Sequence, residues 1–130
     1  MGTSPWTGDG RRLRYSEWRN HMMIFDVKGK VGDSGEYILG SEDTGSHACY
    51  MIYGVMKPSE KGRKLKPGRG HEELFLAVRS DFILTGHFSG AVKEGQAVHL
   101  KGEETCWVEN ATDAEGMYVI SGGHSEAGHH

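Results

Sequence analysis

The chain has 130 residues and a formal net charge of −3 with histidine neutral, from 15 Lys and Arg against 18 Asp and Glu. This length fits one domain, and hydrophobic and charged fractions of 36% and 25% are ordinary for a globular protein. The slight acidic excess argues against a nucleic-acid partner, and no apolar stretch approaches the roughly 20 residues that a membrane span requires.

The first 14 residues are polar and rich in glycine, and they lack the apolar core of a signal peptide. We therefore expect residues 1–14 to form a flexible N-terminal segment. Two cysteines, Cys49 and Cys106, do not make a disulfide framework, and free thiols fit a reducing compartment. Together these features predict a cytoplasmic protein.

Short apolar runs follow one another along the rest of the chain, separated by turn signals that contain many of the 20 glycines. Residues 15–20 fit a helical turn, and the segment 57–70 is basic and predicted to be a solvated loop. The strands are predicted at 21–27, 36–39, 48–56, 71–78, 82–84, 97–100, 105–108 and 117–120. Many short strands without a long helical period favour an all-β sandwich or barrel.

Two segments in the second half of the chain resemble the motifs of the small single-domain cupins. The first, around 70–80, contains GHEELFLAV and is similar to the motif that surrounds the metal-binding glutamate of that family. The second, around 95–110, joins EGQAVHL to CWVEN, which resembles the motif in which a histidine precedes an asparagine by four residues. The resemblance implies a cupin jelly roll, a double-stranded β-helix barrel, over residues 15–123. Residues 124–130 would be a histidine-rich tail.

The sequence departs from the family at its metal ligands. If Glu73 is the glutamate of the first motif, the usual His-x-His positions fall within 66–69, which holds no histidine. The nearest imidazole is that of His71, and Cys106 occupies the histidine position of the second motif. The resemblance therefore implies an incomplete site, with His71, Glu73 and Cys106 as candidate ligands for iron, zinc, nickel or manganese.

Residues two apart on a strand share a face, so His71 and Glu73 would point to the same side as Phe75. On an interior face they would form a metal site or, without metal, a general acid and base. The alternative is a solvated strand edge, with Cys106 a small buried side chain. We expect His87 to be exposed, His99 to have a packing role on its strand, and Trp107 to face outward.

Two functions remain open at this stage. Resemblance to cupins implies metal-dependent chemistry on a small molecule, of the dioxygenase or isomerase type, with Glu73 and His71 as catalytic residues. The alternative is a non-catalytic cupin that binds a small molecule or a metal, as loss of ligands would allow. In either case the expected partners are a small-molecule ligand in the barrel and a second copy of the chain. The homodimer is implied by the family and by open sheet edges.

Overall fold

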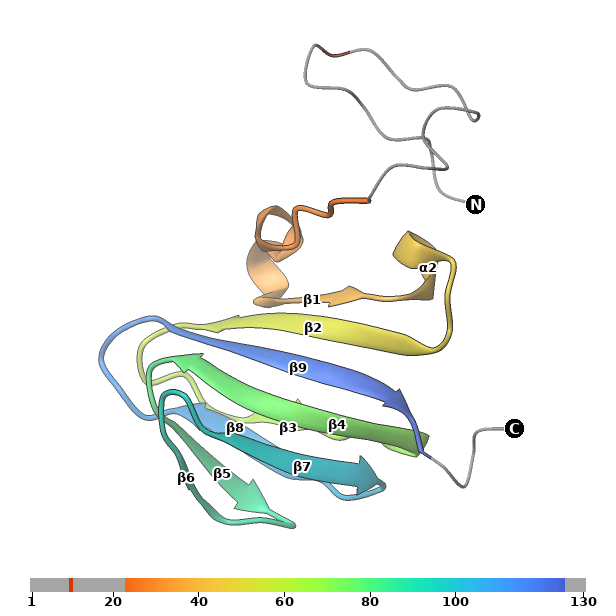
Figure 1. Ribbon diagram of the computed structural model, residues 1–130. Helices are drawn as coiled ribbons and strands as arrows, with labels where there is room; N and C mark the ends of the chain where they lie inside the picture. Colours follow the sequence, from red (N-terminus) through yellow and green to blue (C-terminus); the bar gives the residue numbers. More distant parts are fainter. Residues whose placement is uncertain (1–9, 11–22, 126–130) are drawn as a thin grey trace.

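The computed structural model describes Gly10 and residues 23–125, and these form two antiparallel sheets that face each other (Figure 1). One sheet has five strands in the order β1-β2-β9-β4-β7, and the other has four in the order β3-β8-β5-β6. The strands are β1 (Glu36–Leu39), β2 (Cys49–Met56), β3 (Arg63–Leu65), β4 (Gly68–Arg79), β5 (Phe82–Gly86), β6 (Gly90–Val92), β7 (Ala97–Gly102), β8 (Cys106–Asn110) and β9 (Gly116–His124). This is an all-β jelly roll, as predicted.

Helical structure in the described residues is short and lies next to β1. The 3-10 helices η1 (Lys28–Lys30) and η2 (Gly32–Ser34) precede that strand, and α2 (Ser41–Thr44) follows it. The α2 helix is fastened to β1 because the Tyr37 hydroxyl donates a hydrogen bond of 2.7 Å to the Asp43 carboxylate. This bond holds the pKa of Asp43 below its usual value.

The core lies between the two sheets, because successive side chains along each strand point alternately inward and outward. On β4, Phe75 and Ala77 are fully buried, whereas Leu74 and Leu76 between them are exposed on the outer face. Phe75 stacks on Tyr118 at 4.8 Å between ring centroids, and Phe82 meets both rings edge-on. The centre of the jelly roll is therefore filled by aromatic side chains.

Seven of the eight predicted strands overlap strands of the structure, and β1 matches its predicted range. The prediction was wrong at 23–27, which is irregular and leads into η1, while residues 21 and 22 lie outside the described part. The segment 57–70 was also misjudged, because it contains β3 and the start of β4. No helix among the described residues is long and apolar enough to cross a membrane.

Candidate functional site

Glu73 is the acidic residue buried deepest among the described side chains, and β4 directs it between the sheets beside Phe75. Its neighbours across the sheet are Leu100 on β7 and Gly122 on β9. Burial raises the pKa of Glu73 because a charged carboxylate loses its hydration there, although a hydrogen bond from Tyr50 partly opposes the shift. Of the two orientations that the sequence left open, the interior one and the solvated strand edge, the structure has the interior one for Glu73.

Tyr50 is the direct partner of Glu73. It lies on β2, and its hydroxyl donates a hydrogen bond of 2.5 Å to the Glu73 carboxylate. Burial, and next the contact with Glu73, raise the pKa of Tyr50, so the phenol keeps its proton at neutral pH. The ring fits because residue 122 is glycine: a Cβ there would lie 2.2 Å from it. Tyr50 was not among the candidate site residues predicted from the sequence, although the Gly122-Gly123 pair is a signal of a bulky neighbour.

His71 lies at the rim of the same interior, two residues before Glu73. Its ring meets Tyr50 edge-on at 5.9 Å and lies 5.1 Å from the ring of His124, both measured between centroids. His124 is the last residue of β9, and its Nε2 lies 2.7 Å from the carbonyl oxygen of His47. Three histidines from separate parts of the chain thus meet at one end of the jelly roll.

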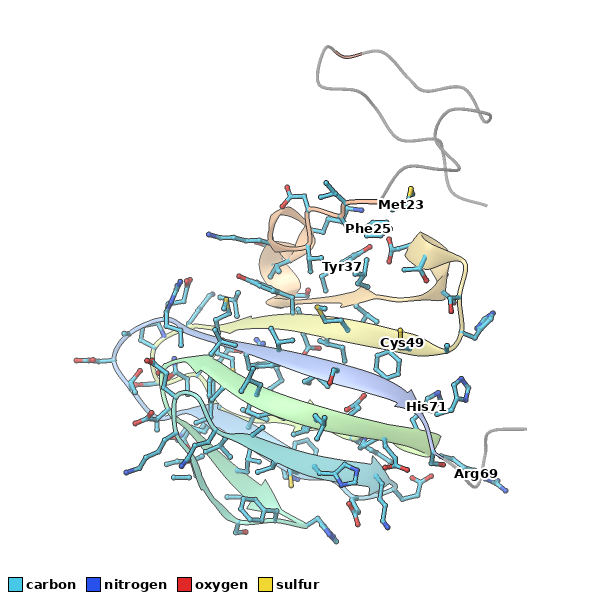
Figure 2. All side chains as sticks on the ribbon, viewed as in Figure 1. Met23, Phe25, Tyr37, Cys49, Arg69 and His71 are labelled. Carbon is cyan, nitrogen blue, oxygen red and sulfur yellow. The ribbon has the colours of Figure 1, made fainter. Side chains whose placement is uncertain are left out.

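A pocket of about 260 Å³ opens at this end. Figure 2 shows Cys49 and His71 there, with Arg69 just beyond them. The walls combine imidazoles and hydroxyls with a few apolar atoms: Ile38, Gly40, Ser41, Ser46, His47, Cys49, Tyr50, His71 and His124. Tyr50 connects this histidine pocket to Glu73, which has only 5% of its surface exposed. A bound molecule would therefore touch Tyr50 and the histidines, with Glu73 behind them.

Cys106 does not join this cluster. It lies on β8 in the other sheet, fully buried, as predicted for a small core side chain. Its Sγ lies 3.4 Å from the backbone nitrogen and 3.5 Å from the carbonyl oxygen of Phe88. Among residues 23–125, no three side chains of His, Cys, Asp or Glu come together in a way that could hold a metal ion.

The residues present do not fit the metal centre that the family resemblance implies. The Glu73 carboxylate already accepts a hydrogen bond from the Tyr50 hydroxyl, and Cys106, in the other sheet, is hydrogen-bonded to Phe88. The usual histidine positions, 66–69, hold no imidazole. A transition metal ordinarily needs three or four protein ligands at one point. His71 and Glu73 share a face, but they form a pair with Tyr50 rather than a ligand set.

The other residues singled out from the sequence lie outside the histidine pocket and make ordinary structural contacts. His87 is exposed, as predicted, and lies 3.3 Å from Glu104. His99 points outward from β7 and contacts the Glu72 carboxylate at 2.8 Å. Trp107 also faces outward, as predicted. Within the basic segment, however, Arg63 is not solvated: its guanidinium donates to the carbonyls of Gly35 and Val55 and pairs with Glu60.

No protein-family model matches the sequence, and no curated protein matches it. Solved structures do resemble the fold. An oxalate oxidase matches with a TM-score of 0.67 at 13% identity, over 95% of this chain and 70% of its own. A predicted oxalate decarboxylase from Thermotoga maritima gives 0.58 at 13% identity, over 69% and 81% of the two chains. A cupin-superfamily sugar phosphate isomerase from Silicibacter pomeroyi gives 0.55 at 13% identity, over 79% and 68%.

Proposed function

We propose that this chain, a small cupin by its fold, binds a small organic anion in the histidine pocket. Its structural neighbours include an oxalate oxidase and a sugar phosphate isomerase, so the same fold serves ligands that carry carboxylate or phosphate groups. At such low identity the fold is shared and the chemistry must come from the site. The proposal therefore rests on the side chains at the end of the jelly roll.

The meeting of His47, His71 and His124 around Tyr50 is the observation that carries the proposal. The imidazole of His71 and the hydroxyls of Ser41 and Ser46 can donate hydrogen bonds to an anion, whereas the Nε2 of His124 already contacts the carbonyl oxygen of His47. The one buried carboxylate nearby, Glu73, is screened from the pocket by the Tyr50 hydroxyl that it binds. The lining thus offers donors to a negative ligand without exposing an acidic side chain beside it.

A second candidate function is metal-free acid–base catalysis, and the raised pKa of Glu73 favours it. A buried carboxyl with a raised pKa can take part in proton transfer with a neighbouring group. Here that group is Tyr50, the link between Glu73 and the pocket. Chemical change in a ligand that binds, abolished by Glu73→Gln while binding persists, would identify an enzyme. Unchanged ligand would identify a binding protein.

The binding proposal predicts that small organic acids raise the melting temperature of the protein. Oxalate, malonate, citrate and a sugar phosphate are suitable probes, tested by thermal shift and then calorimetry. The His71→Ala variant should lose at least about tenfold in affinity, equivalent to one or two charge-assisted hydrogen bonds.

His87→Ala is the matched control, because His87 is an exposed histidine that pairs with Glu104 away from the histidine pocket. It should bind as tightly as the wild type. Equal losses in both variants, or binding unaffected by His71→Ala, would contradict the location of the site. Because the described residues hold no cluster of metal ligands, we expect elemental analysis to find less than one transition metal per chain. A full equivalent that disappears in Glu73→Ala would restore the metal hypothesis.

A further inference from the structure

The outer face of the four-stranded sheet carries an exposed tryptophan. This sheet lies behind and below the five-stranded one in Figure 1, whereas the strands that line the histidine pocket belong to the five-stranded sheet. Trp107 on β8 has 44% of its surface exposed, although its neighbours Cys106 and Val108 are buried. A single exposed apolar side chain is common on protein surfaces, so the surroundings of Trp107 decide whether it has a role.

The strand register places polar side chains on both sides of the indole. Trp107 is paired with Lys64 on β3 and with Thr85 on β5. In the adjacent row, two residues along β8, Glu109 is paired with Ile83 on β5. Directly opposed residues in an antiparallel pair point to the same side of a sheet. These five side chains therefore form two neighbouring rows on one face.

A pocket of about 240 Å³ lies against these rows, and we call it the tryptophan pocket. Its lining side chains belong to Lys61, Ile83, Thr85, Trp107 and Glu109, with Gly62 at the edge. The hollow stays open at Gly62, because this residue has a φ of 84° and a Cβ built on it would meet no atom within 4 Å. Sites for drug-sized ligands commonly measure roughly 300–1,000 Å³, so this smaller hollow suits a single ring.

The walls of the tryptophan pocket combine apolar surface with every kind of hydrogen-bonding group. Trp107 and Ile83 are the apolar part. The ammonium of Lys61 donates hydrogen bonds, the carboxylate of Glu109 accepts them, and the hydroxyl of Thr85 does both. Among the described residues, none pairs with the side chains of Lys61, Thr85 or Glu109. These three groups are therefore available to a ligand.

We propose that the tryptophan pocket binds a neutral oligosaccharide, with one hexose ring stacked on Trp107. A pyranose ring has a face of polarised C–H groups and an edge of hydroxyls. The C–H groups are attracted to the negative face of an indole. Each hydroxyl both donates and accepts, so adjacent hydroxyls of one ring match the carboxylate of Glu109 and the ammonium of Lys61.

Charge complementarity favours a neutral ligand over an anionic one. Lys61 and Glu109 contribute one positive and one negative charge to the pocket, so they leave it without net charge. A phosphate or a uronate would meet the carboxylate of Glu109 directly. Sites for single-stranded nucleic acid combine a basic groove with several aromatic side chains, whereas Trp107 is the one aromatic residue that lines this pocket in the described chain.

The second row extends the binding surface beyond the tryptophan pocket. Ile83 is paired with Ala91 on β6, and both residues are exposed. A ring linked to the one on Trp107 would lie on this low apolar strip. We therefore expect the affinity to rise from a free hexose to a tetrasaccharide.

Titration calorimetry of the full chain with maltotetraose, cellotetraose and mannotetraose tests this proposal. At least one should bind, and Trp107→Ala should weaken its binding at least about tenfold because the stacking surface is lost. Trp107→Phe should retain part of the affinity, since a smaller aromatic ring remains. Binding should hardly change between about 0.05 and 0.5 M salt, because a neutral ligand has no charge to screen.

Phe88→Ala is the matched control. Phe88 is 42% exposed in the turn between β5 and β6, and it does not line the tryptophan pocket. This variant should bind as tightly as the wild type, with circular dichroism showing that each variant is folded. His71→Ala should also leave this binding unchanged, so the result does not depend on the histidine pocket.

Three outcomes would overturn the proposal. The first is that none of the neutral tetrasaccharides binds, and the second is that Phe88→Ala weakens binding as much as Trp107→Ala. The third is that tetragalacturonate or an oligothymidylate binds more tightly than every neutral sugar, which would assign the pocket to an anion instead.

Discussion

At the scale of single residues, the site depends on one buried hydrogen bond. The Tyr50 hydroxyl donates a hydrogen bond to the Glu73 carboxylate. Glu73 is the residue that resembles the metal-binding glutamate of the first cupin motif. A buried carboxylate is costly unless it is hydrogen-bonded or neutral. Tyr50 offsets part of this cost when Glu73 is ionised, and the raised pKa of Glu73 shows that burial remains the larger effect.

Replacing Glu73 with glutamine should therefore alter the pH dependence of stability. Below its ordinary value near 4.5, the Glu73 carboxyl is neutral in both folded and unfolded chains and carries no charge penalty. As pH rises from there to the higher folded-state pKa, the unfolded chain ionises this group while the folded protein keeps the proton, so the wild type loses stability and the amide variant does not. The melting temperature of Glu73→Gln relative to wild type should rise between pH 4 and pH 8. A constant difference would show that the folded-state pKa of Glu73 is not raised.

At the scale of strands, glycines create the space that the interior tyrosines occupy. Gly122 on β9 leaves room for the Tyr50 ring, and Gly54 on β2 does the same for Tyr118. Each tyrosine can then lie flat across a neighbouring strand and reach an acidic partner, Glu73 or Glu36. The glycines thus make room for the two tyrosine–glutamate pairs that form inside the sheet.

Gly122→Ala should displace Tyr50 and weaken folding by about 1–3 kcal/mol, the usual cost of overpacking a tight interior. Urea unfolding measures this loss, and ligand affinity at the histidine pocket should fall with it because Tyr50 moves. Gly40→Ala is the control, since its new Cβ would meet nothing closer than 3.7 Å, at Ile38. Equal stability of the two variants would contradict the tight fit of Tyr50 over Gly122.

Short apolar runs separated by turn residues predicted most of the strands. They identified β1 and the centres of β2 and β4, where apolar residues are frequent. They failed at β3, whose residues Arg63 and Lys64 have the composition of a solvated loop. Arg63 folds into the structure because Glu60 and backbone carbonyls receive its guanidinium, a long-range arrangement that local sequence does not encode.

The candidate site was predictable only in part, for a similar reason. Strand periodicity correctly put His71 and Glu73 on one face, and the burial of Cys106 followed from its residue type. Tyr50, His47 and His124 come from distant segments, so their approach to His71 depends on the pairing of β2, β9 and β4. His124, assigned to the tail, is part of β9, and residues 126–130 lie outside the described chain.

At the scale of the whole molecule, Asn110 ties the two sheets together. From β8 its amide nitrogen donates to the carbonyls of Met56, Lys57 and Ala114. Its oxygen accepts a hydrogen bond from the Ser80 hydroxyl at 2.9 Å. The asparagine that resembles the last residue of the second cupin motif therefore has a structural role here.

Asn110→Ala should lower the free energy of unfolding by at least about 2 kcal/mol, because several buried carbonyls lose their donor. The effect should extend to the whole molecule, so fluorescence and circular dichroism should report one earlier transition in urea. Asp113→Ala, an exposed change in the same turn, is the control and should alter stability little. A loss confined to the turn, without a shift of the main transition, would show that Asn110 does not connect the sheets.

The start of β4 limits how this protein could be redesigned. Gly68 and Gly70 have backbone φ angles of 96° and 80°, and the register of β4 against β7 shifts between Gly68 and Glu72. These glycines stand just before His71, next to the positions at which the cupins that the sequence resembles carry paired imidazoles. An engineer who introduced histidine at both positions would add about 1–2 kcal/mol of strain at each. Building paired imidazoles into this strand would thus require rebuilding its backbone before adding ligands to it.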